Sequence, residues 1–359
     1  MTNPKRGIAK MIADTINPYS WITATRNRMF DAGLLQSHIF TLPTICIGNI
    51  SVGGTGKTPH TEYLAKLLKE QYHTVVLSRG YGRKSRGYIL AKPNTPMELI
   101  GDEPFQIKHK IKDIDVAVCE RRAEGIEHIM ADIKKPDVIL LDDAFQHRYV
   151  KAGLNILLID CNRPIWQDCI LPFGRLREGI NGIKRADIVI ITKCNNLTTE
   201  QKTLYRNYIR KKKDIPVFFS SMRYGDIYPL FNNRDKAIAA GDKVLLVTGI
   251  ANPEPLKKDI ERRGADVILI KFADHHNFTT GDLASIAKCY NGIEGNEKII
   301  ITTEKDATRL LQNPNIPQVV KENIYVQPIE VEILNEEKEL FNKIILDYVT
   351  KNSRDSRIP

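Results

Sequence analysis

Short apolar runs alternate along this 359-residue chain with segments in which apolar residues recur every three or four positions. The runs are rich in β-branched residues and bounded by polar residues, which predicts buried strands, while the wider spacing predicts helices. The first strands are predicted over residues 44–47, 74–78, 115–119, 137–141, 155–160 and 187–192. Strands that alternate with helices indicate a parallel sheet with right-handed crossovers.

The pattern restarts near Lys211, and further strands are predicted over residues 216–220, 243–249, 266–271, 298–303 and 324–329. A chain of this length is long for one hydrophobic core, so two domains are expected. The prediction is an α/β protein with an amphipathic segment over residues 1–42, a core domain over 43–211 and a smaller α/β domain over 212–359.

The predicted N-terminal segment interleaves Lys and Arg with apolar side chains, among them Trp21, Met29 and Phe30 beside Arg26 and Arg28. A basic amphipathic segment of this kind can lie in a membrane interface. A helix packed on the surface of its own domain has the same pattern, so the sequence leaves both readings open.

Composition narrows the class of protein. Apolar residues make up 42% of the chain and charged residues 27%, as in a soluble globular protein. No apolar run is long enough to span a membrane, no secretory signal is evident, and the six cysteines form no C-x-x-C pair. The net charge of +10 favours an acidic partner without choosing one, and no aromatic-interleaved basic motif predicts nucleic-acid binding.

The strand predicted at residues 44–47 leads into a glycine-rich turn and a helix, the context that a phosphate-binding P-loop requires. The turn comprises Ser51, Val52, Gly53, Gly54, Thr55, Gly56, Lys57 and Thr58. Its backbone N–H groups can surround an anion, Lys57 can reach the β- and γ-phosphates, and the Thr58 hydroxyl can bind Mg²⁺. Ser51 replaces the first glycine of the strict pattern, which leaves a turn that binds nothing as the alternative.

Acidic and basic residues follow several predicted strands. Asp142 and Asp143 end the most apolar strand, the Walker B arrangement that holds Mg²⁺ in P-loop enzymes. Asp102 and Glu103 open a helix, where acids also occur simply as caps. Asn195 follows Thr192-Lys193 where GTP-binding proteins carry Asp, and its amide fits guanine poorly, so GTP is disfavoured.

Two further predicted strands end in polar clusters whose roles cannot be assigned from the sequence. Asp274-His275-His276 combines an acid with two histidines, and both structural and catalytic roles remain open. The segment 302–306, Thr-Thr-Glu-Lys-Asp, is either a helix cap or a functional element.

The motifs GNISVGGTGKTP, SRGYGR, GDEP, LLDDAFQHR, LPFGRLRE, TK, FADHHNF and TTEKDATRL occur in an order that resembles the tetraacyldisaccharide 4′-kinase family. The resemblance covers nearly the whole chain, and the family shares the Ser51 departure. It implies transfer of the ATP γ-phosphate to the 4′-hydroxyl of a tetraacylated glucosamine disaccharide 1-phosphate, which forms lipid IVA. It also implies two α/β domains joined by a β-ribbon, and a peripheral enzyme at the cytoplasmic face of the inner membrane. Because the acyl chains must reach the site from the bilayer, residues 1–42 are then expected to associate with the membrane, with Trp21, Met29 and Phe30 facing lipid. No protein partner is predicted.

The resemblance also implies roles for residues. Lys57 and the glycine loop hold ATP, and Thr58, Glu103, Asp142 and Asp143 serve Mg²⁺. Asp102 is the expected base for the 4′-hydroxyl, paired with His275 from the second domain. Five side chains are candidates for binding the substrate's phosphate or the transferring phosphoryl group: Arg79, Tyr81, Arg121, Arg175 and Arg177.

Two other functions remain as alternatives. One is a P-loop kinase or ligase that acts on a water-soluble small molecule, and it would turn over without lipid. The other is a non-catalytic nucleotide switch, which would bind nucleotide tightly without acceptor-dependent release of ADP. The poor fit of Asn195 to guanine counts against the switch.

Overall fold

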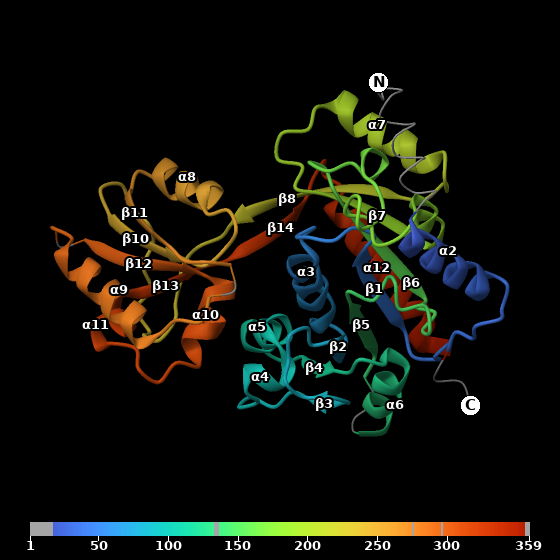
Figure 1. Cartoon of the computed structure of the whole chain (residues 1–359), viewed down its shortest axis with the longest axis horizontal. Helices are drawn as coiled ribbons and strands as arrows, with labels where there is room; N and C mark the ends of the chain where they lie inside the picture. The colour runs from blue at the N-terminus through green and yellow to red at the C-terminus, as the bar shows by residue number, and fades with distance from the viewer. Residues whose placement is uncertain (1–16, 133–135, 275, 296, 356–359) are drawn as a thin grey trace.

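Two sheets lie side by side and are joined by a pair of strands that runs between them (Figure 1). The computed structural model describes residues 17–132, 136–274, 276–295 and 297–355. The larger sheet has the strand order β14-β8-β7-β6-β1-β5-β2-β4-β3 and the smaller sheet the order β11-β10-β12-β13-β9. The prediction of a P-loop-type α/β fold with a second, smaller α/β unit is confirmed.

The larger sheet is parallel except at its two edges, where β14 and β3 run antiparallel to their neighbours. Its strands are β1 (Thr44–Asn49), β2 (Thr74–Ser78), β3 (Ile89–Leu90), β4 (Asp115–Val118), β5 (Val138–Asp142), β6 (Leu154–Asp160), β7 (Ile188–Thr192), β8 (Val217–Tyr224) and β14 (Ile329–Ile333). β1, β2, β5 and β7 are buried throughout, as the continuous apolar runs predict for strands covered on both faces.

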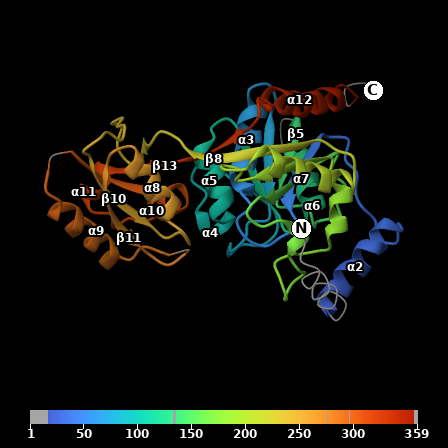
Figure 2. The same cartoon turned by 90° about the horizontal axis from the view of Figure 1, so that it is seen from above.

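Helices cover both faces of this sheet. One apolar layer packs α3 (Lys57–Lys69), α5 (Asp102–Lys110) and α12 (Lys338–Asp355) on the sheet, and the opposite layer packs α6 (Arg122–Asp132) and α7 (Thr199–Arg210). α2 (Pro18–Asp31) lies at the edge of the large lobe, on the side away from α12 (Figure 2). The short helix α4 (Met97–Ile100) directly precedes α5.

The smaller sheet consists of β9 (Tyr228–Pro229), β10 (Lys243–Thr248), β11 (Asp266–Lys271), β12 (Lys298–Thr303) and β13 (Ile324–Gln327). α9 (Thr280–Gly292) and α11 (Gln318–Asn323) pack on one face and α8 (Glu254–Arg262) on the other, while α10 (Glu304–Leu311) follows β12. β8 and β14 form the antiparallel ribbon between the lobes. Because β14 and α12 return to the larger sheet, the chain after residue 212 is divided between both lobes rather than confined to the smaller one.

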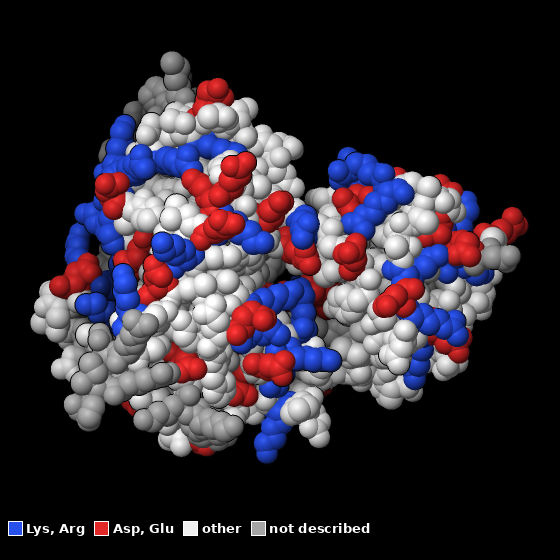
Figure 3. Space-filling view, turned by 180° about the vertical axis from the view of Figure 1, so that it is seen from behind, with Lys and Arg blue, Asp and Glu red and all other residues white. Residues whose placement is uncertain are grey.

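The space-filling view shows a hollow between the two lobes (Figure 3). Basic and acidic side chains are interspersed around it, and Lys and Arg also gather along the outer edge of the large lobe. The parallel strands β1, β5 and β2 end on the side of the sheet where the P-loop lies, so their terminal side chains converge there.

Candidate active site

The predicted P-loop forms the turn between β1 and α3. Gly53 and Gly56 have φ values of 103° and 86°, a left-handed backbone that glycine adopts without strain. Gly56 is the N-cap of α3, so the helix begins at Lys57 with its first N–H groups directed toward the loop. The local sequence thus produces the anion-binding turn that the motif predicts.

Contacts inside the large lobe fix this loop from several sides. The Asn49 amide donates to the Thr55 hydroxyl at 2.6 Å, and the Thr192 hydroxyl donates to the Thr55 carbonyl at 2.9 Å. Lys193 donates to the Gly54 carbonyl and pairs with Asp160 at 2.7 Å. Thr192, the last residue of β7, and Lys193 after it therefore hold the loop in place. In the sequence these two residues served only to test the chain for guanine recognition.

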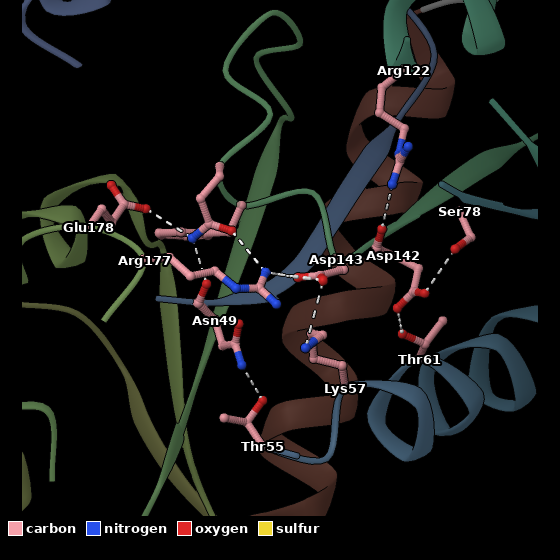
Figure 4. Close-up of polar contacts among 12 residues, drawn as sticks. Asn49, Thr55, Lys57, Thr61, Ser78, Arg122, Asp142, Asp143, Arg177 and Glu178 are labelled. Atoms are coloured by element: carbon pink, nitrogen blue, oxygen red, sulfur yellow. Dashed lines mark hydrogen bonds and ion pairs between the residues drawn. The ribbon is translucent and has the colours of Figure 1, made fainter. Parts of the chain in front are cut away.

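Asp142 ends β5 and is buried, with 1% of its surface exposed. Its two carboxylate oxygens accept hydrogen bonds from the Thr61 hydroxyl at 2.9 Å and the Ser78 hydroxyl at 3.2 Å (Figure 4). Arg122, also buried, donates to the Asp142 carbonyl at 3.1 Å. Burial, followed by the charge of Asp143, raises the pKa of Asp142.

Asp143 is adjacent but faces a different environment. Its φ of 45° turns the chain out of the strand, and the side chain meets two cations (Figure 4). Arg177 Nη1 lies 2.9 and 3.1 Å from the two carboxylate oxygens, and Lys57 Nζ lies 3.7 Å from Oδ2. The loop that carries Arg177 also touches the P-loop, since Val52 N–H donates to the Arg175 carbonyl at 2.7 Å.

Asp102 and Glu103 open α5 after Gly101, whose φ is 90°. Both line a cavity of about 520 Å³ between the lobes, together with Thr58, Tyr81 and Arg309. Glu103 is exposed at the cavity, yet desolvation by the surrounding protein, then the charge of Asp142, raises its pKa to about 7, while Lys57 and a hydrogen bond with Thr58 oppose the rise. The structure thus brings Lys57, Thr58, Asp102, Glu103 and the Asp142–Asp143 pair to one region.

The donor chemistry of this region fits Mg²⁺. Magnesium is usually held by one or two carboxylates and substrate phosphates while it keeps several waters. Mutual repulsion among Glu103, Asp142 and Asp143 is part of the cause of the raised pKa values, and a cation would relieve it. Within the described ranges, no cluster of three or more His, Cys, Asp or Glu side chains could hold a metal by itself, so Thr58 and the nucleotide would have to complete the shell.

The residues predicted to bind the substrate, and His275, do not all lie at this cavity. Arg79, Tyr81, Arg121 and Arg175 are exposed, and Tyr81 lies at the cavity with 85% of its surface accessible. Arg177 is committed to Asp143 in this arrangement. His275 lies outside the described residues, whereas its neighbour His276 contacts Asp282 at 2.9 Å in the cap of α9.

α2 settles part of the question about the N-terminal segment. Residues 1–16 lie outside the described ranges. Phe30 is buried against Tyr149, so the expectation that Phe30 faces lipid is wrong. Trp21 and Ile22 are 58% and 67% exposed, and the helix therefore packs one side on the lobe while it presents these two side chains to solvent. No helix in the described part of the chain has the length and apolar character needed to cross a bilayer.

Several contributors to the site were not predicted. Arg122 and the hydroxyls of Thr61 and Ser78 hold Asp142, and Arg309 contacts Asp102. Arg122 follows a predicted strand and could have been a candidate for that reason, but nothing in the sequence distinguishes it from its neighbour Arg121. The sequence assigns no role to the segment TTEKDATR, yet its arginine, Arg309, contacts Asp102 at the site.

Comparisons with known proteins relate this chain to one family. The family model for LpxK, tetraacyldisaccharide-1-P 4′-kinase, matches residues 15–350. The tetraacyldisaccharide 4′-kinase of Bacteroides thetaiotaomicron is 46% identical over 94% of this chain and 94% of its own length, and that of Flavobacterium psychrophilum is 42% identical over 93% and 95%. The crystal structure of "apo" form LpxK from Aquifex aeolicus in complex with ATP has a TM-score of 0.73 and 28% identity, covering 92% of this chain and 96% of that one.

Proposed function

Because the chain belongs to the tetraacyldisaccharide-1-P 4′-kinase family, we propose that it transfers the γ-phosphate of ATP to the 4′-hydroxyl of tetraacyldisaccharide 1-phosphate, which forms lipid IVA in lipid A biosynthesis. One observation carries the proposal at the level of the site. Thr58 of the P-loop and the acidic start of α5 line one interlobe cavity, and the Walker B pair lies beside Lys57 of the same loop.

The reaction needs positioned phosphates, neutralised charge and an oriented hydroxyl. The P-loop N–H groups and Lys57 bind the β- and γ-phosphates, and Lys57 offsets the charge that develops on the transferring group. The 4′-oxygen forms a bond to the γ-phosphorus as the bridging bond to ADP breaks. Asp102 accepts the proton of the 4′-hydroxyl, and its partnership with His275 stays a prediction.

The same residues would hold Mg²⁺: the Thr58 hydroxyl and Asp142, with Glu103 and Asp143 directly or through water. When bound, the ion would neutralise phosphate charge and fix the phosphates in line with the acceptor. The protein's part is to keep Asp142 ordered through Thr61 and Ser78 and to hold Asp143 with Lys57 and Arg177.

The acceptor's acyl chains require access from a lipid surface, and we assign this contact to α2. Trp21 and Ile22 are exposed there beside basic residues, the combination that favours a membrane interface. The proposed location is peripheral, at the cytoplasmic face of the inner membrane. Arg79, Arg121 and Arg175 are exposed and remain candidates for binding the substrate's 1-phosphate.

Release of ADP with and without tetraacyldisaccharide 1-phosphate in mixed micelles tests the proposal. We expect ADP only with the lipid, and Asp102→Asn should lower kcat by about 10²–10⁴-fold while ATP affinity stays unchanged, since it removes only the base. Asp214→Asn is the matched control, because the Asp214 side chain is 92% exposed, four residues after the last residue of α7. Turnover that is indifferent to lipid would instead support a kinase for a soluble acceptor, and tight ATP binding without turnover would support a switch.

A further inference from the structure

The helix α10 follows β12 and carries the TTEKDATR segment whose role the sequence leaves open. Thr303 is its N-cap, and the Thr303 hydroxyl accepts a hydrogen bond from Asp306 N–H at 3.2 Å. Capping accounts for the threonine but not for the charged residues that follow. Three of those, Glu304, Asp306 and Arg309, are buried at the junction between the lobes.

Asp306 fixes α10 to the smaller sheet. Its Oδ2 accepts hydrogen bonds from the Thr248 hydroxyl at 3.0 Å, the Gly249 N–H at 3.0 Å and the Thr303 hydroxyl at 2.7 Å. These donors come from the ends of β10 and β12, so the carboxylate joins two strand ends to the helix. Its other oxygen lies 3.7 Å from Arg309, one turn further along.

Arg309 extends from this base to the larger lobe. Its Nη2 donates to Oδ2 of Asp102 at the start of α5, and only 4% of the arginine side chain is exposed. A guanidinium keeps its charge at every physiological pH and presents donors in a rigid plane. A buried partner of this kind restrains the carboxylate more firmly than a solvated ion pair would.

The far end of α5 is held by the same helix. Lys110 lies 2.5 Å from Glu62 of α3 and also pairs with Glu304, the first residue of α10. Glu304 in turn accepts a hydrogen bond from Ile329 N–H at 3.1 Å, where the connecting ribbon begins. α10 therefore contacts both ends of the helix that presents Asp102 and Glu103.

We infer that Arg309, which the smaller lobe supplies, is a positioning residue for the kinase reaction and holds the Asp102 carboxylate directed into the cavity. This inference rests on the proposed function, since it assigns Asp102 as the base. It gives α10 a role beyond packing: docking of the lobes and orientation of the base become one event. The P-loop and the Asp142–Asp143 pair, where the nucleotide is proposed to bind, lie within the larger lobe, so we expect nucleotide binding not to depend on the contact between Arg309 and Asp102.

Steady-state kinetics of the full-length protein on tetraacyldisaccharide 1-phosphate tests the inference. Arg309→Ala should lower kcat by roughly 10²-fold, the scale of a mispositioned general base, with the Kd for ATP unchanged. Arg309→Lys keeps the charge but loses the planar donors, so it should recover part of that loss. Arg262→Ala is the control, because Arg262 lies on α8 of the smaller lobe, 3.6 Å from Asp259, with 75% of its side chain exposed.

The decisive comparison uses the Asp102→Asn background in single-turnover reactions. If Arg309 acts through Asp102, adding Arg309→Ala to Asp102→Asn should change the residual rate by less than about twofold, because coupled residues are non-additive. An equal loss in both backgrounds, or full kcat in Arg309→Ala, would overturn the inference. Arg309→Lys keeps the test valid if the alanine variant does not fold. Failure of the proposed function is distinct, since the unaltered protein would then show no lipid-dependent ADP release.

Discussion

The site contains two carboxylate pairs, and they differ in what holds them. Asp142 and Asp143 are secured entirely within the larger lobe, by hydroxyls from α3 and β2 and by Lys57 and Arg177. Asp102 and Glu103 begin a helix of the same lobe, yet Asp102 is paired with Arg309 from the smaller one. In the proposed function the phosphate half, around Asp142 and Asp143, therefore lies in one lobe, whereas the acceptor half, around Asp102, is assembled across two.

In the proposed function, this difference separates the residues that bind ATP from the residues that set the rate of phosphoryl transfer. A nucleotide site that is formed by one lobe alone can bind nucleotide whatever the relative position of the two lobes. A base that is oriented across an interface works only while the lobes are docked, which couples turnover to domain arrangement. Variants of the first pair's surroundings should therefore change ATP affinity and turnover together, and variants of the second should change turnover alone.

Among changes outside the Asp102–Arg309 contact, the largest effect is expected from Lys57→Met, which disrupts the phosphate half. Loss of a cation that faces the phosphates should lower kcat by roughly 10²–10³-fold, because its stabilisation grows in the transition state. ATP affinity should fall as well, measured by calorimetry. Lys66→Met on the exposed side of α3 provides the control. If Lys57→Met lost turnover but bound ATP normally, the proposed division between the halves would fail.

An intermediate effect is expected from α2, which concerns delivery of the acceptor. Replacing both Trp21 and Ile22 with Ser removes two exposed apolar side chains, each able to contribute about 1.5–3 kcal/mol on full burial in lipid. Binding to anionic vesicles should weaken by about tenfold or more, with the Kd for ATP unchanged. Leu340→Ser is the control, since Leu340 is 55% exposed on α12, on the opposite side of the lobe (Figure 2). Unaltered vesicle binding would remove α2 from the proposal.

The phosphate half could be predicted because its information is local. A strand, a glycine-rich turn and a helix follow one another directly, and the carboxylates end an adjacent parallel strand. The sequence could not separate Asp142 from Asp143, because the difference arises from the φ of 45° that turns Asp143 toward Lys57.

The acceptor half was harder because its contacts join distant segments. Arg309 and Asp102 are 207 residues apart, and no pattern in either segment specifies the other. The return of α12 to the larger sheet was equally hidden, since its apolar side would suit either sheet. Phe30 was misassigned for a related reason: an amphipathic helix does not reveal which apolar residues meet the protein and which meet solvent.

The smallest effect at neutral pH is expected from His60, which links the P-loop to strand β8 of the connecting ribbon. Its Nδ1 contacts the Gly56 carbonyl of the P-loop at 2.7 Å, and its Nε2 contacts the Ser220 hydroxyl of β8 at 2.9 Å. Burial lowers the pKa of His60 from 6.5 to about 4. The folded protein thus keeps the ring neutral while the unfolded chain takes up a proton below pH 6.5.

The sign of the pH dependence follows from that difference. Above pH 6.5 both states are neutral at His60 and the group contributes no slope. As the pH falls from 6.5 toward 4, the unfolded state binds more protons, so stability declines by up to about 3 kcal/mol. His60→Gln removes the titration and should flatten the dependence of Tm on pH over this window, while its offset from the unaltered protein at pH 7.5 reports packing alone. Parallel Tm curves for the two proteins from pH 7.5 down to 4.5 would show that His60 is charged in the folded state, and its role as a neutral link between P-loop and ribbon would be lost.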